Sequence, residues 1–170
     1  SGPNDWNHIF AWGLYLKGDN TNVSITGPTN LAELFATDAD VQLSGSGSFD
    51  MGVFAETVRL YGNSVVTMTN VRLGDTTRGT GVVGLVEANG QSHCTLQDVR
   101  TGPVRLRTTS PQATITAGNV FEPQRIVQEQ FGGAVTLQQA TATQSTDLQN
   151  ADFEQPLLAG GLPPHWQVVG

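Results

Sequence analysis

Two segments of the chain repeat each other, GNSVVTMTNVRLG at residues 62–74 and GQSHCTLQDVRTG at residues 90–102. They share six identities in thirteen positions and begin 28 residues apart. Internal repetition is the signature of a fold built from successive similar units, each of which buries its apolar residues against the next. The repeat therefore predicts a solenoid.

Weaker copies of the same phrase occur at residues 19–27, 39–45 and 112–121. Within each copy apolar and polar residues alternate, which is typical of a strand with one buried face. Aligning one apolar residue per copy gives the anchors Ile25, Leu43, Met68, Leu96 and Ile115. The anchors are separated by 18, 25, 28 and 19 residues, an irregular period that is typical of a solenoid with loops of variable length.

The repeated phrase also predicts how each unit turns. A second short strand follows the first, and Asn70 or Asp98 stands at the join; Asn and Asp tolerate the left-handed backbone conformation, which suits a corner. We therefore expect an all-β fold, a right-handed parallel β-helix of about five or six irregular rungs. An antiparallel sandwich or barrel is the alternative. Met68 is expected to stack over Leu96 in the interior, because neighbouring rungs lie about 4.8 Å apart.

Composition limits the classes of partner. The chain of 170 residues has a net charge of −7, a pI near 4.7 and one lysine. Nucleic acids and anionic membranes attract clustered Lys and Arg, so neither is expected as a partner, and no apolar run is long enough for membrane insertion. The single cysteine, Cys94, excludes an internal disulfide and aligns with Val66, which predicts an interior position. No cofactor motif occurs, and the three His are too far apart to predict a metal site.

Changes of composition predict three parts. Residues 1–121 are expected to form the rungs and an N-terminal entry strand, and residues 122–149 a Gln- and Thr-rich segment that is extended or mediates trimerisation. The phrase NADFE at 150–154, followed by PPHW at 163–166, resembles the opening of jelly-roll carbohydrate-binding modules. This resemblance implies that residues 150–170 are the start of such a module and that the chain is a piece of a longer protein.

Aromatic residues near the N terminus are candidates for carbohydrate binding. Trp6, Trp12 and Tyr15 lie within one short segment, and aromatic rings can stack against the apolar faces of sugars. Packing at the cap of the solenoid is the alternative role, since the exposed end of a solenoid has to be covered.

Arginine residues form a second candidate group. Arg72 and Arg100 occupy equivalent positions in consecutive rungs and are expected to stack on the outside, and Arg105 and Arg107 share one face of a later strand. Such a strip could hold the carboxylates of an anionic saccharide through bidentate hydrogen bonds. The alternative is a solvated outer face on which acids such as Asp75 or Asp98 balance the charge.

Four carboxylates are candidates for catalysis: Asp38, Asp40, Asp50 and Glu56. Glycosidases need two carboxylates about 5 to 9.5 Å apart. Residues one rung apart can converge on a groove, so the sequence separation of these acids does not exclude such a pair. A polysaccharide lyase would instead combine a base with Arg or Lys.

The irregular rungs, the Gln- and Thr-rich segment and the module-like tail together resemble the distal part of a bacteriophage tailspike. The phrase GNSVVTM at 62–68, followed by Asn70 and Val71, is similar to the rung sequences of that group. The resemblance implies a homotrimer on the virion tail that binds a bacterial surface polysaccharide and, in many members, cleaves it with Asp or Glu residues. The rivals are a secreted pectate-lyase-like enzyme and a non-catalytic β-helical adhesin or structural fragment.

Overall fold

The computed structural model describes residues 4–6, 9–27, 29–45, 53–74, 84–101 and 103–140. Most of them lie in β-strands, and the helix in this part of the chain is one 3-10 turn, η2 (Pro123–Arg125). The strands are β1 (Asn4–Trp6), β2 (Ile9–Thr26), β3 (Thr29–Ser44), β4 (Val53–Tyr61), β5 (Val65–Leu73), β6 (Gly84–Ala88), β7 (His93–Thr101), β8 (Val104–Thr108), β9 (Thr114–Val120), β10 (Ile126–Gln130) and β11 (Ala134–Gln139).

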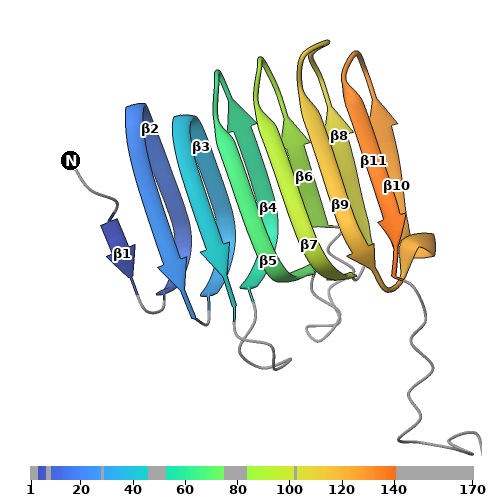
Figure 1. Cartoon of the computed structure of the whole chain (residues 1–170), viewed down its shortest axis with the longest axis horizontal. Helices are drawn as coiled ribbons and strands as arrows, with labels where there is room; N and C mark the ends of the chain where they lie inside the picture. Colours follow the sequence, from blue (N-terminus) through green and yellow to red (C-terminus); the bar gives the residue numbers. More distant parts are fainter. Residues whose placement is uncertain are drawn as a thin grey trace, which may run out of the picture. The chain divides into compact units, whose positions relative to one another are not determined.

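These strands form one parallel sheet that winds into a solenoid of about five turns (Figure 1). The first part of β3 pairs with β4 and its second part with β5. From there β4, β6, β8 and β10 continue one side, here called the A face, and β5, β7, β9 and β11 continue the other, the B face. Every pairing between described strands is parallel, so the predicted all-β parallel β-helix is confirmed and the antiparallel alternative is wrong.

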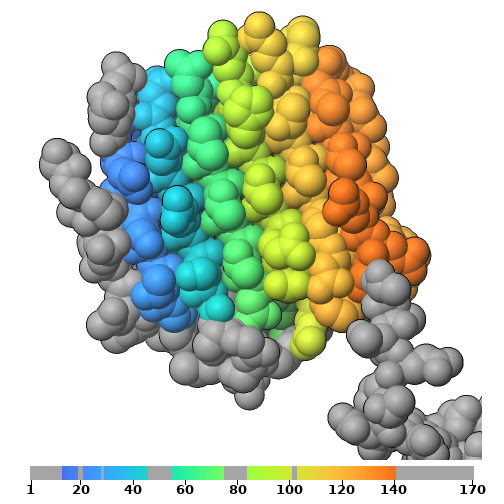
Figure 2. All heavy atoms as spheres, viewed as in Figure 1, coloured from blue at the N-terminus to red at the C-terminus, as the bar shows by residue number. Residues whose placement is uncertain are grey.

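The two repeated segments are neighbouring turns, as the sequence predicts. β5 pairs with β7 from Val65 opposite His93 to Leu73 opposite Thr101, which is the 28-residue offset of the two phrases. Figure 2, seen from the same side as Figure 1, shows successive turns as adjoining bands. The sequence is repeated because each turn must present matching side chains to the next.

Corners are visible where the alternation of buried and outward residues breaks. In β3 two consecutive outward residues, Thr37 and Asp38, separate the buried Ala36 from the buried Ala39. Asp38 has a φ of 51°, and Asn70, Asp98 and Asn119 have φ values of 57°, 56° and 52°. The predicted use of Asn and Asp at the corners is confirmed, because their short polar side chains lower the cost of the left-handed region.

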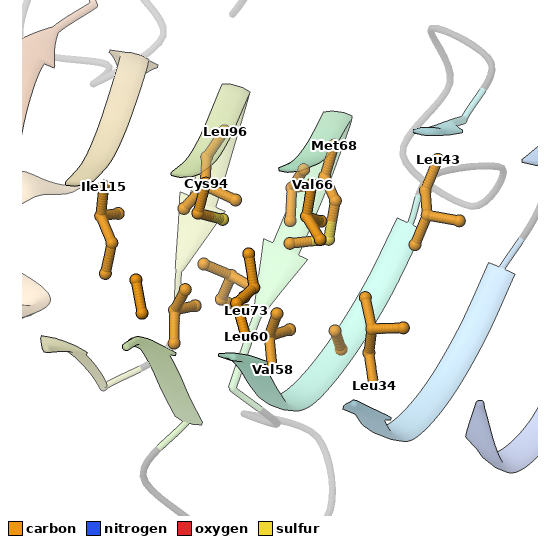
Figure 3. Packing of buried hydrophobic residues seen from close by; sticks show 14 of the residues in the cluster. Leu34, Leu43, Val58, Leu60, Val66, Met68, Leu73, Cys94, Leu96 and Ile115 are labelled. Atoms are coloured by element: carbon orange, nitrogen blue, oxygen red, sulfur yellow. The ribbon is translucent and has the colours of Figure 1, made fainter. Parts of the chain in front are cut away.

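The core consists of columns of aliphatic residues that run from turn to turn. Val66 and Met68 of β5 adjoin Cys94 and Leu96 of β7, and Figure 3 shows these side chains facing residues such as Leu60 across the interior. One column contains Ile25, Leu43, Met68, Leu96 and Ala117. A second column contains Val23, Val41, Val66, Cys94, Ile115 and Val135.

These columns confirm the predicted stacking of Met68 on Leu96 and the interior position of Cys94, which is 1% exposed. They also correct the fifth anchor. Ile115 pairs with Cys94, and the residue that follows Leu96 in its column is Ala117. The sequence alignment chose the larger aliphatic side chain of that copy, although a small residue fills the equivalent position.

The chain separates into two compact units, Ser1–Ala140 and Thr141–Gly170. The solenoid belongs to the first unit, and the second lies outside the described residues. β10 pairs with β8 and β11 with β9, so the solenoid continues to Gln139, within the segment predicted at 122–149. The predicted three-part division, including a carbohydrate-binding-like module at 150–170, stays a prediction.

Candidate functional site

One outward column of side chains runs along the A face. In-register parallel pairing places equivalent residues of neighbouring strands about 4.8 Å apart. In β3, β4, β6 and β8 these outward residues alternate with buried ones such as Leu34 and Val58. The column, here called the outer column, consists of Tyr15, Phe35, Arg59, Glu87, Arg107 and Glu129.

The end of the outer column nearer the C terminus is an ion-pair ladder. Arg107 donates from Nε to Oε2 of Glu129 at 2.7 Å and from Nη1 to Oε2 of Glu87 at 3.3 Å. The hydrogen bond to Glu129 is the main cause of the raised pKa of Arg107. Arg105 lies farther from the same carboxylate, with 3.8 Å between its Nη1 and Oε1 of Glu129. The charges of Glu87 and Glu129 are therefore compensated within the protein.

The end nearer the N terminus is aromatic. The rings of Tyr15 and Phe35 stack with their centroids 5.2 Å apart and their planes 18° from parallel. The hydroxyl of Tyr15 donates a hydrogen bond to Glu33, which is the main cause of the raised pKa of Tyr15. Tyr15 nevertheless remains 62% exposed. This pair holds one aromatic ring against the sheet and presents the other to solvent.

Arg59 lies between these two parts of the outer column. Its Cζ is 5.4 Å from the centroid of the Phe35 ring, a cation–π distance. Its Nε is buried and has no hydrogen-bond partner. Glu87, its neighbour on the other side, contacts Arg107. Within the described part of the chain, no carboxylate lies within ion-pairing distance of Arg59.

The B face presents a different outer surface. The column at its centre carries hydroxyl and amide groups: Ser24, Gln42, Thr67, Thr95, Thr116 and Thr136. None of these six side chains is ionisable. Among the described residues of the two central columns, aromatic and charged side chains thus belong to the A face.

The structure describes one of the three aromatic candidates in full. Tyr15 is an exposed aromatic residue, as a sugar-stacking role requires, and it packs on Phe35 of the next turn. Trp6 belongs to β1, where it pairs with Ile25, and Trp12 belongs to β2, but their side chains lie outside the described part of the structure. Carbohydrate binding by these three residues stays a prediction.

Arg72 and Arg100 are neighbours in register on β5 and β7, as the repeat predicts. They do not belong to the outer column. The Cζ of Arg100 lies 5.1 Å from the ring centroid of Phe121, and both arginines make further interactions. Asp98, which we expected to balance their charge, accepts a hydrogen bond from Asn119. Asp75, the other expected acid, lies outside the described residues.

The four catalytic candidates occupy different settings. Asp38 is a corner residue whose Oδ1 accepts a 2.9 Å hydrogen bond from the backbone N–H of Asn63. Asp40 points outward from β3 and is exposed, and Glu56 lies partly buried in β4. Asp50 lies outside the described residues. The geometry gives Asp38 a structural role, and catalysis by any of the four stays a prediction.

We did not predict Phe35, Arg59, Glu87 or Glu129 as site residues from the sequence. Phe35, Arg59 and Glu87 each alternate with buried aliphatic residues in their own strands, which is a signal that they point outward. Glu129 lies in β10, where none of the residues is buried, so its strand carries no such signal. Their alignment in one column depends on the register between turns. That register cannot be read from segments that lack a repeated phrase.

Among the described residues, no group of three or more His, Cys, Asp or Glu side chains could hold a metal ion. In the same part of the chain, no helix has the length and apolar character needed to cross a bilayer.

Comparison with family models, with curated proteins and with solved structures finds no match to this chain. The geometry of the solenoid is therefore the basis for a functional proposal.

Proposed function

We propose that this chain is the polysaccharide-recognising part of a bacteriophage tailspike and that it contacts the glycan along the outer column of the A face. The observation that carries the proposal is the exposed Tyr15 ring, held by stacking on Phe35 at the end of a charged column. In this proposal the functional form of the protein is a homotrimer on the virion tail. Depolymerisation of the bacterial surface polysaccharide belongs to the intact parent protein.

The shape of the surface supports a linear ligand. Six strands contribute one side chain each to the outer column, so its groups repeat along one direction at a spacing of about 4.8 Å. A polysaccharide also repeats along one direction, and its sugar rings offer both apolar faces and hydroxyl groups. Tyr15 can stack on a ring, while the partly buried arginine and glutamate side chains can hydrogen-bond to hydroxyls.

The direct test is binding of the full chain to surface polysaccharides purified from a panel of bacterial strains, immobilised and measured by biolayer interferometry. At least one polysaccharide should bind, and Tyr15→Ala should weaken that binding about tenfold, the equivalent of roughly 1.4 kcal/mol. Thr95→Ala, in the central column of the B face, is the matched control and should bind like the wild type. Binding of no polysaccharide, or equal binding by Tyr15→Ala, would contradict the proposal.

Two measurements address the remaining parts. Sedimentation equilibrium should give the mass of three chains, and a monomer at micromolar concentration would remove the trimeric tailspike from the proposal. Incubation with a bound polysaccharide, followed by assays for new reducing ends and for unsaturated products, separates hydrolase, lyase and binder. Release of either product by the chain itself would show that it retains depolymerase activity.

A further inference from the structure

We propose that the outer column selects a saccharide that carries a carboxylate, with Arg59 as the residue that binds the carboxylate and Tyr15 as the platform for a neighbouring sugar ring. This inference rests on the proposed function and names the substrate class of the same surface.

The two arginines of the outer column differ in their charge partners. Arg107 is hydrogen-bonded to carboxylates on both sides, Glu87 and Glu129. Arg59 has the Phe35 ring on one side and, on the other, Glu87, whose carboxylate contacts Arg107. The alternation of positive and negative charge along the column therefore ends at Arg59, whose guanidinium ion-pairs with no carboxylate in the described part of the chain. An anionic group of a ligand would complete the alternation.

The Arg59 side chain is packed against an aromatic ring before a ligand binds. The guanidinium lies over Phe35, and Nε is buried without a hydrogen-bond partner. The Phe35 contact restricts the planar group, so less side-chain freedom has to be lost when it binds a carboxylate. The terminal nitrogens of the same guanidinium can bind an anion, which gives it a charge partner that the described residues do not supply.

The register of the strands fixes the distance between Arg59 and the aromatic platform, Tyr15. Tyr15 and Arg59 lie two strands apart in the outer column, which corresponds to about 10 Å along the solenoid axis. This separation suits a sugar ring stacked on Tyr15 with a carboxylate on an adjacent sugar. Glu33, whose carboxyl group accepts a hydrogen bond from the Tyr15 hydroxyl, lies beside the platform. The carboxylate of the ligand is therefore directed toward Arg59 and away from the Tyr15 end.

The test uses the Nε–H signals of arginine in ¹H–¹⁵N spectra of the full chain near pH 6. Three uronate tetrasaccharides serve as probes, from polygalacturonate, alginate and hyaluronan, each compared with its carboxyl-reduced form. At least one acidic probe should shift the Arg59 signal, which is assigned by its absence in Arg59→Gln. The reduced form should shift it at least about tenfold less at equal concentration. The signal of Arg125, which lies outside the outer column, should hardly move in the same spectra.

Variants separate this inference from the proposed function. Arg59→Gln should lose about tenfold in affinity for the acidic probe, whereas Arg125→Gln, which removes the same charge outside the outer column, should retain it. Tyr15→Ala should reduce the Arg59 shift. Equal shifts from acidic and reduced probes would overturn selection of a carboxylate and leave polysaccharide recognition standing. Absence of any Arg59 shift, or equal losses in the two arginine variants, would also overturn it, whereas the proposed function fails only in the polysaccharide binding measurement.

Discussion

Asn119 and Asp98 occupy the same corner of successive turns, and Nδ2 of Asn119 donates a 2.5 Å hydrogen bond to Oδ1 of Asp98. Both residues have positive φ values, 52° and 56°. Asp98→Ala should lower the free energy of unfolding by about 2 kcal/mol, because it adds the left-handed cost of an alanine and removes the hydrogen bond. Urea denaturation measures the loss. Asp98→Gly removes the hydrogen bond without the backbone cost and should lose less. An alanine variant as stable as the glycine variant would refute the backbone argument.

Gly62 shows how closely one turn approaches the next. Its φ is 64°, and a Cβ at this position would lie 2.0 Å from Oδ1 of Asp38. Gly62→Ala should therefore destabilise the chain by about 2 to 3 kcal/mol, measured by urea denaturation. In the background of Asp38→Gly the clash disappears and the backbone cost remains, so the same substitution should cost less there. An equal cost in both backgrounds would mean that Asp38 can move aside freely.

Cys94 gives a pH dependence with a defined sign. Burial raises the pKa of its thiol from 9.0 to about 12. The unfolded thiol ionises first as the pH rises, so the contribution to stability is fully present below pH 9 and is lost between about pH 9 and 12. The free energy of unfolding should fall in this window by up to about 1.4 kcal/mol per pH unit relative to Cys94→Val. Equal slopes for both proteins would contradict the burial of the thiol. In the folded chain at pH 8, the thiol should also resist a thiol-specific reagent.

Leu96 tests the interior columns. It is fully buried between Met68 and Ala117. Leu96→Ala should cost about 2 to 5 kcal/mol, because it removes apolar contacts and leaves a cavity in a column packed from both sides. Leu137 lies at the end of the same column and is only partly buried, so Leu137→Ala should cost less. Thermal and urea unfolding of the two variants measure the difference. Equal losses would show that the column is not stacked as described.

The repeat predicted the architecture because its two copies fix a register. Alignment of the thirteen positions places Met68 on Leu96 and Cys94 in the position equivalent to Val66. Both pairings are present in the structure. The fifth anchor was wrong because alignment of a weak copy favours a large aliphatic residue, Ile115, over the small Ala117 that occupies the column. The rule that a left-handed corner suits Asn and Asp needed only the residue types, and it held at Asn70 and Asp98.

The candidate site was less predictable for a physical reason. Tyr15 could be proposed from the sequence alone, because it is an aromatic residue in a short segment that contains other aromatic residues. The relation of Arg59 to Phe35 and Glu87 depends on pairings between turns of unequal length. The sequence separation between paired residues of β3, β4 and β6 depends on the lengths of the loops that join these strands. No hydrophobic pattern in the sequence predicts those lengths. The ion pairs of Arg107 with Glu87 and Glu129 could not be predicted from the sequence for the same reason.

The strand register also sets the order in which the molecule can be built. Pairings between the described strands join residues at most 28 positions apart, so each turn needs only its predecessor as a template. A chain leaving the ribosome from its N terminus can therefore deposit one completed turn on another before the last strands exist. Translating chains that are stalled after β9 has emerged should already protect Cys94 of β7 from a thiol reagent. Chains that are stalled earlier, when β9 does not yet cover β7, should not protect it. Synthesis and assembly can run in the same direction and at the same time.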